Sequence, residues 1–145
     1  MELTDKEINE IAENLDCGLR CFFNLKTREI KTVLNLDSWQ SADEELWEDA
    51  LKEIEDNSSD YFEFEGMSSR DSFNSMVDFI DTIDNLRLQE RLTRALNKSK
   101  LFRNFKWEID NSGDYRQKWF DYKKVRFIEW VKAQIEDFNT AKIQE

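Results

Sequence analysis

The stretch LRCFFNLKTREIKTVLN, residues 19–35, decides the fold of this chain. Side chains alternate in character over residues 19–25 and again over residues 29–35, and Lys26-Thr27-Arg28 lies between the two runs. Alternation with a period of two is typical of β-strands. The stretch therefore predicts a β-hairpin with a short loop whose turn type the residues leave open. The side chains that we expect to face the core from the first strand are Leu19, Cys21, Phe23 and Leu25.

Helical spacing of apolar residues begins on both sides of this hairpin. Thr4-Asp5-Lys6-Glu7 is a capping box, and the apolar residues after it predict a helix over residues 5–16. Ser41-Ala42-Asp43-Glu44 is a second capping box, which predicts a helix over residues 42–56. Residues 61–65 alternate again and predict a third short strand. Further helices are predicted after Ser68 or Ser69 as far as Ile83, around residues 88–96 and 102–109, and over residues 114–138.

These elements predict an α+β fold. A small three-stranded sheet, made of the hairpin and one more strand, packs with about six helices, and the C-terminal half is all helical. A length of 145 residues predicts a single domain over residues 1–145. Aromatic residues make up 13% of the chain, which excludes a globally disordered protein.

Charge is divided unevenly along the chain. Residues 1–85 carry 7 Lys+Arg and 23 Asp+Glu, a net charge of −16, whereas residues 86–145 carry 14 and 9, a net charge of +5. The protein as a whole is acidic, at −11. Such an asymmetry favours either a charged partner or two oppositely charged layers within one domain.

Several residue types that enzymes commonly use are missing. The chain has no His, which removes the commonest general base and metal ligand, and its 3 Gly are isolated, so no glycine-rich phosphate loop can form. We expect no enzymatic activity, no cofactor and no metal. The N-terminus does not resemble a signal peptide, no apolar run could span a membrane, and the 2 Cys suggest a reducing compartment. These features predict a cytoplasmic protein that does not contact membranes.

A series of motifs resembles a bacterial family, number zero-one-five-eight in the uncharacterised-protein-family series. The best marker is Phe102-Arg103-Asn104-Phe105-Lys106 with Trp119-Phe120 behind it, and the strand at residues 61–64 and the hairpin also fit. The resemblance covers most of the chain and implies a bacterial protein without an assigned activity. It also implies glycines before Phe102, where this chain has Lys98 and Lys100, and in the hairpin turn, where it has Arg28.

Two residue clusters carry chemistry in other proteins. Cys17 and Cys21 have the spacing of a metal or redox pair, but a closed zinc site needs four ligands, so we interpret them as a helix-end residue and a small core residue. Acidic residues crowd the helix at 42–56 and recur at Asp78, Asp81 and Asp84. Such carboxylates can bind a divalent cation, but a solvated helix face gives the same pattern.

The basic and aromatic segment over residues 98–126 is the main candidate binding site. Bases beside exposed aromatic residues can bind phosphates and stack on nucleobases. The same residues can instead pair with the acidic half of the chain or form a solvated face. The candidate binding residues are Lys98, Lys100, Arg103, Lys106, Trp107, Arg116, Lys123 and Lys124.

The last helix carries two apolar stripes. One core-facing side explains a single stripe, so the second stripe is either buried within the chain or forms an interface between two copies. The first stripe contains Tyr115, Trp119, Tyr122, Trp130 and Ala133. The candidate homodimer interface is the second stripe, which contains Phe120, Phe127, Val131, Ile135 and Phe138.

Taken together, these features predict a small non-enzymatic protein-interaction module. Its partner is an unknown protein or a second copy of the chain. The alternative is a nucleic-acid-associated regulator that uses the basic helices over residues 86–126, which the net charge of −11 disfavours.

Overall fold

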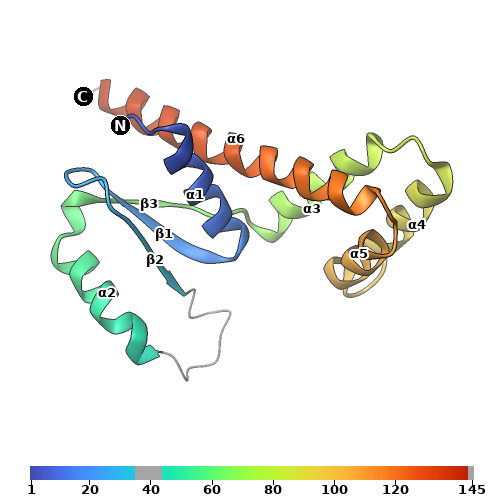
Figure 1. Cartoon of the computed structure of the whole chain (residues 1–145), viewed down its shortest axis with the longest axis horizontal. Coiled ribbons are helices and arrows are strands. Elements are labelled where there is room, and N and C mark those ends of the chain that lie inside the picture. Colours follow the sequence, from blue (N-terminus) through green and yellow to red (C-terminus); the bar gives the residue numbers. More distant parts are fainter. Residues whose placement is uncertain (35–43, 144–145) are drawn as a thin grey trace. The chain divides into compact units, whose positions relative to one another are not determined.

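A three-stranded antiparallel sheet lies at the centre of the N-terminal part of the chain, as the computed structural model in Figure 1 shows. The structure describes residues 1–34 and 44–143. The strand order is β2-β1-β3, with β1 (Leu19–Asn24), β2 (Ile30–Leu34) and β3 (Tyr61–Phe64). Phe23 is opposite Ile30 on one side and Phe62 on the other. The predicted hairpin and third strand are therefore confirmed, and β1 is the central strand.

Six α-helices accompany the sheet in the described part of the chain. They are α1 (Asp5–Asp16), α2 (Glu44–Asp56), α3 (Ser69–Asp81), α4 (Leu86–Leu96), α5 (Leu101–Asp110) and α6 (Tyr115–Ile143). The α+β prediction is confirmed, and both the Thr4–Glu7 box and a box from Ser68 to Asp71 cap their helices. A short 3₁₀ turn, Ser58–Asp60, precedes β3. The predicted capping box at residues 41–44 lies outside the described side chains.

The central strand β1 is buried on both faces, which the sequence analysis did not predict. Phe22 packs with Val33 and Ile54, so α2 covers one face of the sheet. Cys21 and Phe23 point to the opposite face because strand side chains alternate, and they are 0% and 2% exposed. Helix α1 packs against β1, and Phe138 of α6 contacts Phe62, with ring centroids 5.1 Å apart. Leu25, which was predicted to face the core, follows the strand and is exposed.

The hairpin turn contains a left-handed residue, Arg28, with φ of 66°. The amide of Asn24 donates to Glu29 O and its carbonyl accepts from Arg28 N, each at 2.8 Å. Glycine is the residue that adopts this conformation without strain. Here the Arg28 guanidinium donates to Glu7 Oε1 at 2.5 Å and to Glu2 O at 3.1 Å, which ties the turn to α1.

The chain forms two compact units. Unit 1 contains Met1–Gly66 and Phe127–Glu145, and unit 2 contains Met67–Arg126, so α6 contributes residues to both. Unit 2 has its own aromatic core, in which Trp119 lies 5.0 Å from Phe105 and 5.1 Å from Phe79, measured between ring centroids. The prediction of a single domain over residues 1–145 stays a prediction.

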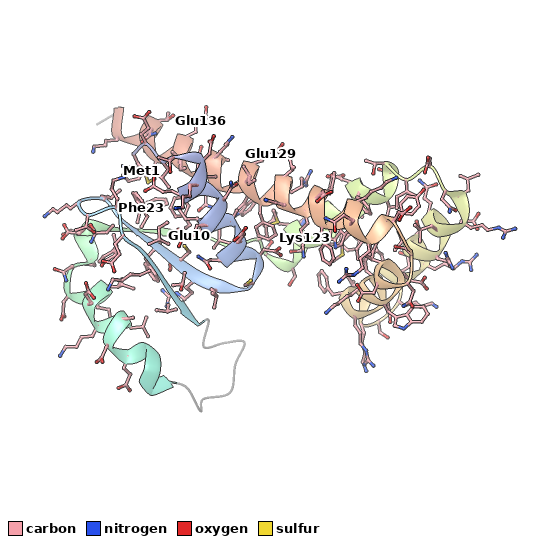
Figure 2. All side chains as sticks on the ribbon, in the orientation of Figure 1. Met1, Glu10, Phe23, Lys123, Glu129 and Glu136 are labelled. Atoms are coloured by element: carbon pink, nitrogen blue, oxygen red, sulfur yellow. The ribbon has the colours of Figure 1, made fainter. Side chains whose placement is uncertain are left out.

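The division into units preserves the charge asymmetry seen in the sequence. Unit 1 has 8 Lys+Arg and 23 Asp+Glu, a net charge of −15, whereas unit 2 has 13 and 9, a net charge of +4. Acidic side chains of unit 1 include Glu10 on α1 and Glu129 and Glu136 on α6 (Figure 2). The basic residues of the sequence therefore belong mainly to one compact body.

Candidate anion-binding surface on helix α5

Helix α5 separates apolar from basic side chains by simple helical spacing. Phe105 and Ile109 are each 1% exposed and belong to the core of unit 2. Arg103, Lys106 and Trp107 follow the i, i+3, i+4 spacing that places residues on one face, and all three are exposed. The buried face packs α5 against the rest of unit 2. The basic face on the other side of the helix is exposed, and this packing fixes its position within unit 2.

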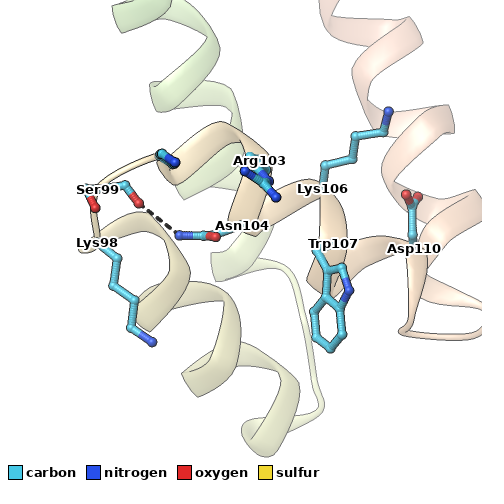
Figure 3. A pocket seen from close by; sticks show the side chains of 8 residues that line it. Lys98, Ser99, Arg103, Asn104, Lys106, Trp107 and Asp110 are labelled. Carbon is cyan, nitrogen blue, oxygen red and sulfur yellow. Dashed lines mark hydrogen bonds between the residues drawn. The ribbon is translucent and has the colours of Figure 1, made fainter.

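A depression of about 810 Å³ lies along this basic face (Figure 3). Five of the eight predicted binding residues line it, and they come from α5 and from the loop that joins α4 to α5. The other three lining residues were not predicted from the sequence. The full lining is Lys98, Ser99, Lys100, Arg103, Asn104, Lys106, Trp107 and Asp110.

A second, smaller depression of about 360 Å³ adjoins the first. It shares Lys98, Asn104 and Trp107 with the larger depression, so these three residues lie at the centre of the combined surface. Arg91 and Arg94 of α4 add two further bases to its lining, which Ala95 and Glu108 complete. We call the two adjoining depressions the Trp107 surface.

Most of the cations on the Trp107 surface have no ion-pair partner among the side chains that the structure describes. Among the side chains of residues 1–33 and 48–142, no acidic group forms an ion pair with Lys98, Lys100, Arg103 or Lys106. Arg91 approaches Glu108 at 3.9 Å and Arg94 approaches Glu90 at 3.8 Å, which are long, solvent-exposed contacts. Exposed pairs of this kind are weak. The surface therefore keeps most of its positive charge available for a ligand.

Trp107 is 63% exposed at the centre of this surface, although Trp is a large and mainly apolar side chain. Asn104 lies beside it, and its Nδ2 donates to Ser99 O at 3.0 Å. Lys100, at the start of α5, has a left-handed backbone with φ of 60°, and its side chain does not cap the helix. The family resemblance implies glycines before Phe102 and in the hairpin turn. In this chain the backbone at those two places is left-handed, at Lys100 and at Arg28.

The other three predicted binding residues do not line either depression. Arg116 lies 3.3 Å from Asp110 and over the ring of Phe120, and Lys123 lies over the rings of Trp119 and Phe120. Lys124 is exposed on α6. These contacts use Arg116 and Lys123 within unit 2, because a cation over an aromatic face is attracted to it.

The sequence spacing of Phe102 and Phe105 predicts that both pack in the core with Trp119, and for Phe102 this prediction is wrong. Phe102 is 40% exposed and lies outside the core cluster. Positions 102 and 105 are three residues apart, but the buried stripe of α5 continues through Ile109 instead and leaves Phe102 at its edge.

The candidate dimer stripe of α6 is partly buried within the chain. Phe127 and Val131 are 7% and 0% exposed, Phe120 packs at the edge of the unit 2 core, and Phe138 contacts Phe62. Ile135 is half-buried. This burial favours the internal alternative of the sequence analysis, because a side chain that is already buried has little area left for a second copy. The oligomeric state stays a prediction.

The two cysteines lie in the places that the sequence predicted. Cys17 caps the end of α1 and is exposed, whereas Cys21 is buried on β1. Burial raises the pKa of the Cys21 thiol to about 12, and the nearby charge of Glu10 acts in the same direction. A thiol with this pKa is protonated at neutral pH and is a poor nucleophile or metal ligand.

Asp78 and Asp84, two acidic residues of unit 2 that the sequence spacing placed together, have separate partners. Asp78 pairs with Arg126 at 3.1 Å, and Tyr115 donates its hydroxyl to Asp84 Oδ1 at 2.5 Å. That hydrogen bond lowers the pKa of Asp84 and raises the pKa of Tyr115. The part of the chain that the structure describes contains no group of three or more Cys, Asp or Glu side chains placed to hold a metal ion. It also contains no helix with the length and apolar character needed to cross a membrane.

Comparison with known proteins agrees with the resemblance noted in the sequence. The model of an uncharacterised protein family, UPF0158, matches residues 3–144. The UPF0158 protein PA5073 of Pseudomonas aeruginosa is 26% identical over 132 residues, which cover 90% of this chain and 81% of that protein. No solved structure matches this chain. Because the family model spans nearly its whole length, the chain belongs to the uncharacterised protein family UPF0158.

Proposed function

We propose that this chain is a small, cytoplasmic, non-enzymatic protein-interaction module that binds its partner through the Trp107 surface. One observation carries the proposal: Trp107 is 63% exposed among four cations that have no ion-pair partner in the described residues. Residues whose truncation costs most binding energy in protein interfaces are enriched in Trp and Arg. Unpaired surface charge adds selectivity for a partner of opposite sign and speeds association.

The non-enzymatic part of the proposal rests on residue chemistry. The chain has no His, and the side chains around Trp107 are bases, amides and hydroxyls, with Asp110 and Glu108 as the acids. Asp110 is paired with Arg116 and Glu108 with Arg91. A nucleophile activated by a neighbouring base is what covalent catalysis requires, and this set of residues does not supply one.

Affinity capture from a lysate of the host organism, treated with nuclease, tests the proposal. We expect the tagged wild-type chain to retain a protein that the double variant Arg103→Glu/Lys106→Glu loses. The matched control is Lys124→Glu/Lys132→Glu, which changes the net charge by the same amount at exposed sites of α6. Equal melting temperatures of the two double variants would show that both are folded.

Two results would contradict the interaction module. One is retention of no protein above the background of an unrelated acidic protein. The other is equal loss of the partner in both double variants, because the effect would then follow net charge and not the Trp107 surface.

The alternative function, binding of nucleic acid, is favoured by the position of the Trp107 ring beside free cations. An exposed ring can stack on a base while the cations contact phosphates. Four neutralised phosphates of a single strand would give a slope of about −3 for log K against log salt. Fluorescence anisotropy of a labelled oligonucleotide at several salt concentrations measures this slope, and a flat or undetectable response rejects the alternative.

A further inference from the structure

The Trp107 surface is mixed in charge, and this feature indicates what kind of ligand it fits. Asp110 lines the larger depression and Glu108 lines the smaller one, so each contains one carboxylate beside its bases. A nucleic acid strand has a negative charge at every phosphate, and some of these would lie close to the two acids. A peptide has discrete charges and can place an amide or an apolar group there instead.

Asn104 provides a second indication. One N–H of its Nδ2 donates to Ser99 O, which leaves the second N–H as a donor, and its Oδ1 accepts no hydrogen bond from the residues that the structure describes. Phosphate oxygens are acceptors and can use only that N–H, whereas a peptide backbone offers both an N–H and a C=O at every residue except proline. A peptide can therefore satisfy both polar groups of Asn104, whereas a phosphate chain can satisfy only one.

The charge of the whole chain provides a third indication. Unit 2 has a net charge of +4, but the protein has −11. At physiological salt, charges more than about 8 Å apart are largely screened from each other. A short acidic segment would therefore interact mainly with the local bases, whereas a long polyanion would carry many charges that these bases do not neutralise.

We infer that the Trp107 surface binds a short acidic protein segment that carries an apolar side chain. Carboxylates of the segment contact Lys98, Lys100 and Arg103, its apolar side chain packs on the Trp107 ring, and a backbone N–H donates to Asn104 Oδ1. This inference rests on the proposed function and adds the chemical class of the partner to it.

Binding of labelled synthetic peptides to the full-length chain, measured by fluorescence anisotropy, tests the inference. The first probe is a short peptide that combines glutamates with leucines. The second is its matched form with serines in place of the leucines, and the third is an oligothymidine of equal charge. We expect the glutamate–leucine peptide to bind most tightly, and the serine form to bind at least about tenfold more weakly, because loss of one buried apolar anchor costs about 1.4 kcal/mol or more.

Four variants then assign the binding to this surface. Trp107→Ala is expected to weaken the glutamate–leucine peptide at least about tenfold, and Trp107→Phe to restore part of the loss. Arg103→Glu is expected to weaken both peptides, whereas Lys132→Glu, the same charge change at an exposed residue outside the surface and outside the predicted binding residues, is expected to leave binding within about twofold.

Each other outcome overturns the inference. Tighter binding of the oligothymidine, with the same sensitivity to Trp107→Ala, would make the surface a nucleic-acid site. Absence of peptide binding, or equal binding of the leucine and serine forms, would remove the apolar anchor on which the inference depends. If a protein captured from the lysate is retained equally by wild type and by Trp107→Ala but is lost by Arg103→Glu/Lys106→Glu, the inference fails and the interaction module stands. If no protein is captured and no peptide binds, both fail.

Discussion

Replacing Phe105 by Ala tests the core of unit 2 more directly than any other single change. Phe105 is 1% exposed, and its ring lies edge-on to the Trp119 ring at 5.0 Å between centroids. The Trp119 ring in turn contacts Phe79 at 5.1 Å. Truncation therefore removes the aromatic contact that joins α5 to α6 and leaves a cavity beside the Trp119–Phe79 pair.

The expected cost follows from these contacts. Phe→Ala in a packed core costs about 3–5 kcal/mol, which includes the cavity left behind. For a protein of this size, 1 kcal/mol shifts the melting temperature by about 2–4 °C, so Phe105→Ala should lower it by about 6–20 °C. If residues 1–145 unfold as one domain, a single transition should move by this amount.

The same helix offers a matched control, Phe102→Ala. Phe102 has the same side chain, three residues away, but it is 40% exposed and lies outside the core cluster. Its truncation should cost less than about 1 kcal/mol. Thermal and urea denaturation, followed by circular dichroism and fluorescence, measure both variants. Equal effects of the two truncations, or a cost below about 1 kcal/mol for Phe105→Ala, would refute the assignment of α5's buried face.

Three further predictions concern the turn before α5, the cysteines and α6. Lys100→Gly should stabilise the chain by about 0.5–1 kcal/mol, because glycine adopts the left-handed backbone without strain. Lys98→Gly, at a residue without positive φ, should not stabilise it. Urea denaturation compares the two variants, and a stabilised Lys98→Gly would contradict the reasoning. A thiol reagent at pH 8 should modify Cys17 but not Cys21 in the folded chain, as mass spectrometry can show. Because the folded pKa of Cys21 is raised from 9.0 to about 12, its contribution to stability is complete below pH 9 and is lost as the pH rises from 9 towards 12. Phe127→Glu should destabilise the chain by about 3–5 kcal/mol by burying an unpaired charge, whereas Val125→Glu, at a residue 53% exposed, should not. Light scattering that showed a wild-type dimer and a stable Phe127→Glu monomer would instead make the second stripe of α6 an interface.

The elements of this chain could be predicted from its sequence because local rules govern them. The Thr4–Glu7 box fixes the start of α1, and period-two alternation marks the hairpin. The five predicted residues of the Trp107 surface could be found because they are close in sequence and lie on or beside one helix. Asn104, Arg91 and Arg94 were missed, although the two arginines follow helical spacing on the outer side of α4.

What surrounds each element was decided by the tertiary structure alone. Alternation in β1 predicted one buried face, but α1 and α2 cover opposite faces, so Phe22 is buried as well as Phe23. Helical spacing treated Phe102 and Phe105 alike, because periodicity gives the direction of a stripe and not its width. The two apolar stripes of α6 arise because the helix packs in two units. Trp119 of the first stripe packs in the core of unit 2, whereas Phe138 of the second stripe packs on Phe62 in unit 1. Burial depends on residues distant in the chain, and only the folded structure brings those residues together.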